Sequence, residues 1–199
     1  MKRFLGVTLL VAGAAAAQTL STAEREKAIQ HLNATRAAFR TSIKGLSAEQ
    51  WDFKPAPETW SVGEVAEHIT LSEAGILELV EKKIMAAPID LLQVEQARGK
   101  DDLVLKAIPD RSEKFKAPEF LQPKARWTQA QIPEQFNASR DRTIELIRTT
   151  REDMRSHTLP HPVMKTMDAY QWVLAISAHC QRHTAQIEEV KANPNFPQN

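Results

Sequence analysis

The fold is decided by residues 168–190, which read DAYQWVLAISAHCQRHTAQIEEV. Apolar residues recur in this segment at spacings of three and four, which is typical of one buried face of an α-helix. Asp168 is a suitable N-cap, and Pro194 ends the pattern. The segment therefore predicts a long amphipathic helix with an apolar stripe made of Val173, Ile176, Cys180, Ile187 and Val190.

Three further segments show the same periodicity, at about 21–45, 61–85 and 133–156. The second begins with Ser61 and Glu64 in the Ser-x-x-Glu form of a capping box. Prolines interrupt residues 51–60 and 157–162, so we expect loops there. Four long amphipathic helices joined in this order predict an all-α four-helix bundle, in which functional sites are built between facing helices.

Residues 87–130 form an unusually long connection between the second and third predicted helices. They hold four prolines among charged residues, with an apolar patch at 89–92 that fits a short helical turn. A connection of this length in a compact domain is either functional, such as a lid over a site, or a disordered insertion. We expect it to be partly ordered.

Composition excludes several classes of protein. Six Gly and one Tyr among 199 residues argue against sandwich, barrel and collagen-like folds. The net charge is +1 and no basic cluster stands out, so nucleic acid is not expected as a partner. The single cysteine, Cys180, cannot form an intramolecular disulfide or a Cys-rich zinc site, and its place on the stripe predicts a packing role. Any metal must therefore be held by histidines and carboxylates.

The N-terminus has the pattern of a secretory signal peptide. A cationic start is followed by an apolar run too short to span a bilayer and then by small residues, which predicts cleavage after Ala17. The alternative is an uncleaved N-terminal anchor. With cleavage, residues 18–199 form a single exported domain, periplasmic or secreted, without membrane contact.

Two of the six histidines lie one turn apart in the last helix. His179 and His183 share a face with Gln186 at the border of the apolar stripe, so their imidazoles should enter the bundle interior. A divalent metal would satisfy both rings together. His68 has the same relation to the stripe of the second helix, and spacing alone leaves it either a hydrogen-bonded structural residue or a third ligand. His157 and His161 flank a proline, and we expect both to face water.

Three segments in this order resemble the signature segments of the DinB/YfiT-like superfamily: WSVGEVAEH at 60–68, DAYQW at 168–172 and HCQRHTAQI at 179–187. The resemblance covers essentially the whole mature chain. It implies a four-helix bundle with a metal held by His68, His179 and His183. Zinc and nickel are the metals usually associated with the family, with waters at the remaining positions.

Three imidazoles with open positions would form the catalytic type of zinc centre, which acidifies a bound water or thiol and polarises a carbonyl. The first hypothesis is therefore a metal-dependent enzyme, either a thiol S-transferase, as some relatives are, or a hydrolase, acting on a small molecule that the sequence does not identify. Gln186 would orient a ligand or bind substrate. Glu64 is explained by capping and Glu67 is expected to face outward, so no general base stands out.

The second hypothesis is a non-catalytic protein whose metal stabilises the bundle for a binding or structural role. A structural site would be closed and four-coordinate, whereas a catalytic one keeps exchangeable water. Export argues against thiol transfer, since small thiol co-substrates are chiefly cytosolic. Homodimers are common among such bundles, although the sequence does not identify a surface for one.

Overall fold

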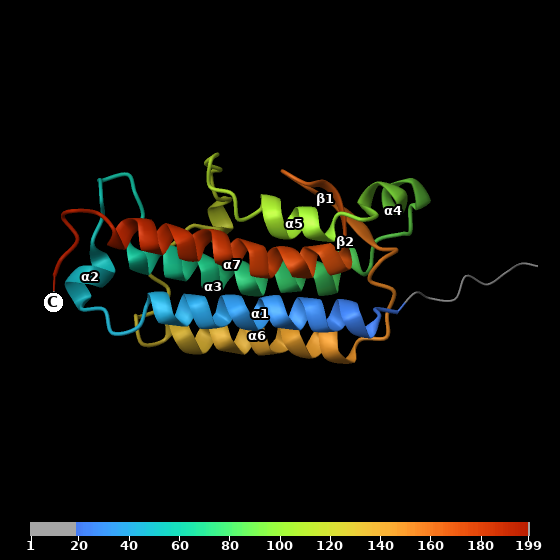
Figure 1. Cartoon of the computed structure of the whole chain (residues 1–199), viewed down its shortest axis with the longest axis horizontal. Helices are drawn as coiled ribbons and strands as arrows, with labels where there is room; N and C mark the ends of the chain where they lie inside the picture. The colour runs from blue at the N-terminus through green and yellow to red at the C-terminus, as the bar shows by residue number, and fades with distance from the viewer. Residues whose placement is uncertain (1–18, 199) are drawn as a thin grey trace, which may run out of the picture.

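The structure is a computed structural model that describes residues 19–198. Its long helices, α1 (Thr22–Ser42), α3 (Val62–Leu79), α6 (Ile132–Thr149) and α7 (Ala169–Lys191), lie side by side along the long axis of the molecule (Figure 1). A π-helical turn, η1 (Val80–Ile84), extends α3. The predicted all-α four-helix bundle is confirmed. The predicted signal peptide lies outside the described residues, none of whose helices has the length and apolar character needed to cross a membrane.

Capping boxes begin three of the four bundle helices. In each, the N-cap side chain accepts the backbone N–H of the third helical residue, whose own side chain accepts the N–H of the N-cap. The pairs are Ser21 with Glu24, Ser61 with Glu64, and Asp168 with Gln171. These caps fix where each helix starts and therefore which of its side chains face the interior.

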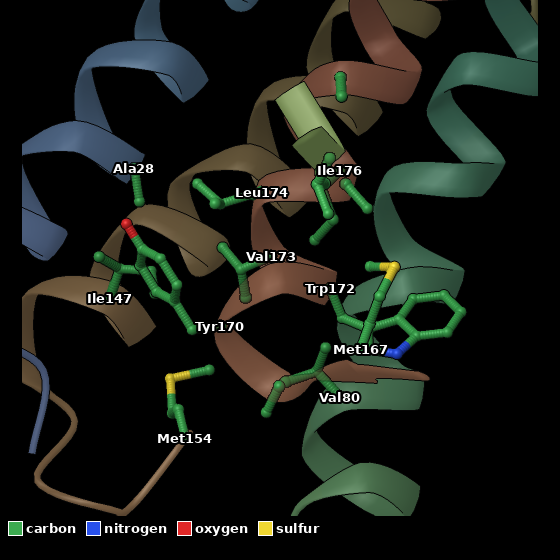
Figure 2. Close-up of a cluster of buried hydrophobic side chains, with 14 of the residues drawn as sticks. Ala28, Val80, Ile147, Met154, Met167, Tyr170, Trp172, Val173, Leu174 and Ile176 are labelled. Atoms are coloured by element: carbon green, nitrogen blue, oxygen red, sulfur yellow. The ribbon is translucent and has the colours of Figure 1, made fainter. Parts of the chain in front are cut away.

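The core surrounds α7, which packs chiefly against α3 and α1. Figure 2 shows Tyr170 and Val173 of α7 between Ala28 of α1, Val80 of η1 and Ile147 of α6. A second buried cluster fills the other end of the bundle, where the rings of Phe39 and Phe136 lie 4.6 Å apart. Such burial contributes about 1.5–3 kcal/mol for each large apolar side chain.

The expected loop at 51–60 is wrong at its start, because Trp51 belongs to the last turn of a short helix, α2 (Ala48–Asp52). This helix forms because Ser47 and Gln50 make a further capping box. The indole of Trp51 lies directly on Gly63, where a Cβ atom would stand 2.3 Å from the indole nitrogen. Glycine is therefore required at position 63 for α2 to dock on the start of α3.

The long connection is partly ordered, as expected, but more of it is helical than the sequence indicated. It contains α4 (Leu91–Ala97), α5 (Asp101–Ala107) and a 3₁₀ turn, η2 (Glu119–Leu121). α5 packs along α7 and buries Val104 completely (Figure 1). The connection thus adds a layer over one side of the bundle.

The expected loop at 157–162 is wrong in part, because it contains a strand. β1 (Thr158–His161) pairs with β2 (Lys165–Asp168) in an antiparallel hairpin, with His161 opposite Lys165. Pro160 has no N–H to donate, but a two-stranded ribbon tolerates proline because each strand has a free edge. β2 leads directly into the Asp168 cap of α7.

Candidate metal centre

The candidate site lies between α3 and α7. The capping box at Ser61 starts α3 so that His68, two turns later, faces α7. The one-turn spacing of His179 and His183 places both of their rings on the side of α7 that faces α3. The chain therefore brings His68 together with two histidines that are more than a hundred residues away in sequence.

The three imidazoles form a compact triangle. Ring centroids are 5.0 Å apart between His68 and His179, 4.5 Å between His68 and His183, and 4.4 Å between His179 and His183. One ring nitrogen of each lies within 4.8 Å of the corresponding nitrogens of the others. Nitrogen ligands at about 2.1 Å from a tetrahedral ion stand roughly 3.4 Å apart, so small ring rotations suffice to hold a metal. The residues present fit a divalent cation.

Two of the rings have their outer nitrogen fixed. His68 Nδ1 donates to the carbonyl oxygen of Leu121 at 2.9 Å, and His183 Nδ1 donates to Gln186 Oε1 at 2.8 Å. Each bond places the proton on Nδ1 and leaves the Nε2 lone pair free for a metal. Gln186 Oε1 also faces the guanidinium of Arg111 at 3.4 Å, which is consistent with the amide oxygen being the acceptor.

The environment keeps all three rings neutral, which is the form that binds metals. Burial lowers the pKa of His68, against a smaller opposing effect of its bond to Leu121. Burial, together with the neighbouring histidines, lowers the pKa of His179 well below its usual value. Burial also lowers the pKa of His183 to about 3, with His68 contributing. Burial makes protonation of any of the three rings unfavourable, so their lone pairs remain free to bind a shared cation.

The long connection covers the site and is held there by arginines. Arg182, on α7 between the two histidines, is 8% exposed and donates to the carbonyl oxygens of Ile108, Asp110 and Glu113. Arg111 forms a two-pronged ion pair with Glu189, with both contacts at 2.6 Å. Leu121 thus contacts His68, and Arg111 contacts Gln186, the partner of His183. The sequence did not indicate either contact. Leu121 acts through its backbone carbonyl, which leaves no signal in the side-chain pattern.

The expectation that Glu67 faces outward is wrong. The residue is 3% exposed, and its carboxylate accepts the backbone N–H of Lys124 at 2.9 Å and the Arg126 guanidinium at 2.8 Å. The returning end of the long connection covers this side of α3 and supplies those donors, which no local pattern could indicate. Glu67 therefore anchors the connection next to His68.

The expectation that His157 and His161 face water is also wrong, because both are half-buried. His157 Nδ1 lies 2.8 Å from the carbonyl oxygen of Ala87, and the His161 ring packs 5.0 Å from that of Trp172. The hairpin folds them back onto the protein. Cys180 is buried at 1% exposure on the apolar stripe, in agreement with its expected packing role.

Comparison with known proteins places the fold in a family. A family model described as the DinB superfamily matches residues 31–187. The uncharacterized protein YuaE of Bacillus subtilis (strain 168) is 28% identical over 160 residues, which cover 80% of this chain and 94% of YuaE. The family match includes all three histidines.

A solved structure shows the same architecture. YfiT from Bacillus subtilis superposes with a TM-score of 0.54 and 15% sequence identity, over 90% of this chain and 93% of YfiT. YfiT is described as "a probable metal-dependent hydrolase with an unusual four-helix bundle topology". At this identity the likeness concerns the fold, whereas the family match spans most of the sequence. The chain belongs to the DinB superfamily.

Proposed function

We propose that this protein is an exported, divalent-metal-dependent hydrolase whose metal ligands are His68, His179 and His183. The observation that carries the proposal is the convergence of three neutral imidazoles, one buried and two partly buried, with ligand nitrogens within 4.8 Å of one another. When bound, zinc or nickel would supply Lewis acidity, lowering the pKa of a water and polarising a carbonyl.

The open character of the site supports a catalytic role over a structural one. Among the described residues, the cluster contains no fourth His, Cys, Asp or Glu, so the protein supplies three ligands where a closed structural site needs four. The hydrolase is favoured over the thiol S-transferase because export separates the protein from small cytosolic thiols. The description of YfiT points to the same reaction class.

The protein's own residues would prepare the reaction in two ways. Leu121 and Gln186 hold the outer nitrogens of His68 and His183, so that both Nε2 atoms point to one place. The connection anchored by Arg182 and Glu67 would limit access of bulk water, which strengthens electrostatic interactions inside the site.

Metal analysis tests the proposal directly. Protein purified from the periplasm is expected to carry about one zinc or nickel ion per chain, measured by mass spectrometry of the metal. Loss of an outer hydrogen bond alone costs about 10–100-fold in metal affinity, so His179→Ala should lower affinity by more than that. His31→Ala, on α1, which carries none of the three histidines, is the matched control and should keep the metal.

Activity is then measured with ester and amide substrates before and after chelation. Hydrolysis that disappears with a chelator and returns with zinc or nickel supports the hydrolase. Purified protein without a divalent metal, or His179→Ala with unchanged metal content and stability, would remove the basis of the proposal. A closed four-coordinate metal without exchangeable water would instead indicate the structural role.

A further inference from the structure

A buried hydroxyl one turn from His68 on α3 has no partner. Ser72 is 1% exposed, and its Oγ makes no hydrogen bond among the described residues. A helical hydroxyl can donate to the carbonyl oxygen four residues earlier, as Thr70 does to Ala66 at 2.9 Å, but Ser72 does not. Leaving a buried hydroxyl unpaired costs about 1–3 kcal/mol. Ser72 is therefore a polar group available to a ligand.

Helix geometry places this hydroxyl on the face of α3 that carries His68. Ser72 follows His68 by four residues, which is one turn, or about 6 Å, along the same side of the helix. α3 and α7 run in opposite directions: His68 meets His183 near the end of α7, whereas Val80 lies near Trp172 at its start (Figure 2). Ser72 thus lies between the histidine cluster and the level of Trp172.

The hairpin brings a second polar group to this side. His161 Nδ1 accepts the backbone N–H groups of Val163 and Met164, both at 3.1 Å, so the proton of the neutral ring is on Nε2. That Nε2–H has no hydrogen-bond partner in the part of the chain that the structure describes. Burial lowers the pKa of His161 to about 4, which keeps the ring a neutral donor near pH 7.

The His161 ring is directed to the same side of α7 as the site. It packs 5.0 Å from Trp172, which lies two turns before His179 on one face of the helix. The indole of Trp172 offers an apolar surface beside His161.

We propose that Ser72 Oγ and His161 Nε2 bind the substrate of the three-histidine centre, through carbonyl oxygens of a small, uncharged acyl compound that extends from the metal towards Trp172. This inference rests on the proposed metal-dependent function. Both groups are neutral donors, so they suit a carbonyl oxygen of an ester or amide. The aromatic surface of Trp172 suits an apolar substituent next to that oxygen.

The test uses two metal-chelating probes on cobalt-loaded full-length protein, with binding measured from the visible spectrum. N-acetylglycine hydroxamate carries a second carbonyl beyond its chelating group, and acetohydroxamate does not. The wild-type protein is expected to bind the longer probe more tightly. Ser72→Ala and His161→Phe should each reduce that preference by about five- to tenfold, the effect of one hydrogen bond. His161→Gln, which keeps an N–H donor, should retain part of it.

Stability separates a ligand-binding role from a structural one. Without probe, Ser72→Ala should leave the melting temperature unchanged or raise it, because the hydroxyl has no partner to lose. Ser177→Ala is the matched control: this equally buried serine donates to the carbonyl oxygen of Leu174 at 2.8 Å. It should lower the melting temperature and leave the probe preference unchanged.

The possible results separate a failure of the proposed metal-dependent function from a failure of the substrate-binding role of Ser72 and His161. Protein that takes up no cobalt overturns the proposed function and the binding role of Ser72 and His161 together. Cobalt-loaded wild-type protein that binds both probes equally, or variants that keep the wild-type preference, overturn the binding role alone. A fall in melting temperature for Ser72→Ala as large as that for Ser177→Ala also overturns it.

Discussion

Arg140 carries a positive charge into the centre of the bundle. Its side chain is completely buried, and its guanidinium pairs with both carboxylate oxygens of Glu73, one contact being 2.8 Å. The remaining N–H groups donate to Thr35 Oγ1 at 2.8 Å and to the carbonyl oxygen of Leu32. The pair joins α3 to α6 and α1, opposite the face of α3 that carries His68.

Removing one member of this pair should strongly destabilise the protein. Arg140→Ala leaves the Glu73 carboxylate buried without its partner, and such a change typically costs about 3–5 kcal/mol. Urea unfolding followed by circular dichroism measures the loss. Arg142→Ala is the matched control, because Arg142 makes an exposed pair with Glu81 at 2.9 Å that contributes about 0–1 kcal/mol.

The double variant Arg140→Met with Glu73→Leu refines this prediction. It replaces both charges by apolar groups of similar size and should recover most of the lost free energy. If Arg140→Ala proved as stable as Arg142→Ala, the pair would not be buried as the structure has it.

At single residues, the sequence predicted side-chain positions that depend on one helix and missed those that depend on how two elements pack together. The shared face of His179 and His183 follows from helical periodicity alone. The position of His68 relative to them depends on how α3 and α7 pack, and it was expected only through the family resemblance. Glu67 was misplaced for the same reason, since its donors come from residues 124–126, more than fifty positions away.

Among the elements, the connection between α3 and α6 is the one most closely tied to the site. Arg182 anchors it by donating to carbonyl oxygens of Ile108, Asp110 and Glu113. Bonds from a charged donor contribute about 1.5–3 kcal/mol each. The connection therefore depends on a single side chain of α7 for several of its contacts.

Arg182→Ala should release this part of the connection. We expect hydrogen exchange at residues 108–115 to accelerate by about tenfold or more, because at least one charge-assisted bond is lost. Exchange in the core of α7 should stay slow. Arg151→Ala, at an exposed position without a side-chain partner among the described residues, is the control. Unchanged exchange at 108–115 in Arg182→Ala would contradict the anchoring role.

Most short elements were not predicted from the sequence, although the helical turn expected at 89–92 overlaps the start of α4. α5 spans seven residues, and β1 and β2 span four each, too few for a periodic pattern to emerge. Their conformations are set by docking on α7 and α4, as the positive φ of 58° at Lys165 illustrates for the hairpin turn. The long helices were predicted because three or more turns of apolar spacing and a cap are local properties.

For the whole molecule, the histidines at this site make stability sensitive to acid. In the folded protein the pKa of His183 is lowered to about 3 and that of His161 to about 4, both by burial, and the pKa values of His68 and His179 are lowered too. An unfolded chain protonates its histidines near pH 6.5. Below that pH the unfolded state therefore binds protons that the folded state does not.

The free energy of unfolding of the metal-free protein should consequently fall as pH decreases from about 6.5 to 4. Each such histidine contributes up to about 1.4 kcal/mol per pH unit, and less for half-exposed His161, where solvent screens the charge. Asp168 acts in the opposite direction, because burial raises its pKa to about 6 and the folded state gains a proton as pH falls. Burial also raises the pKa of Glu73, which acts in the same direction as Asp168. Four histidines outweigh these two carboxyls. Urea unfolding at pH 7, 6, 5 and 4.5 measures the slope, and a free energy that stays constant or rises over this range would contradict the burial of the cluster.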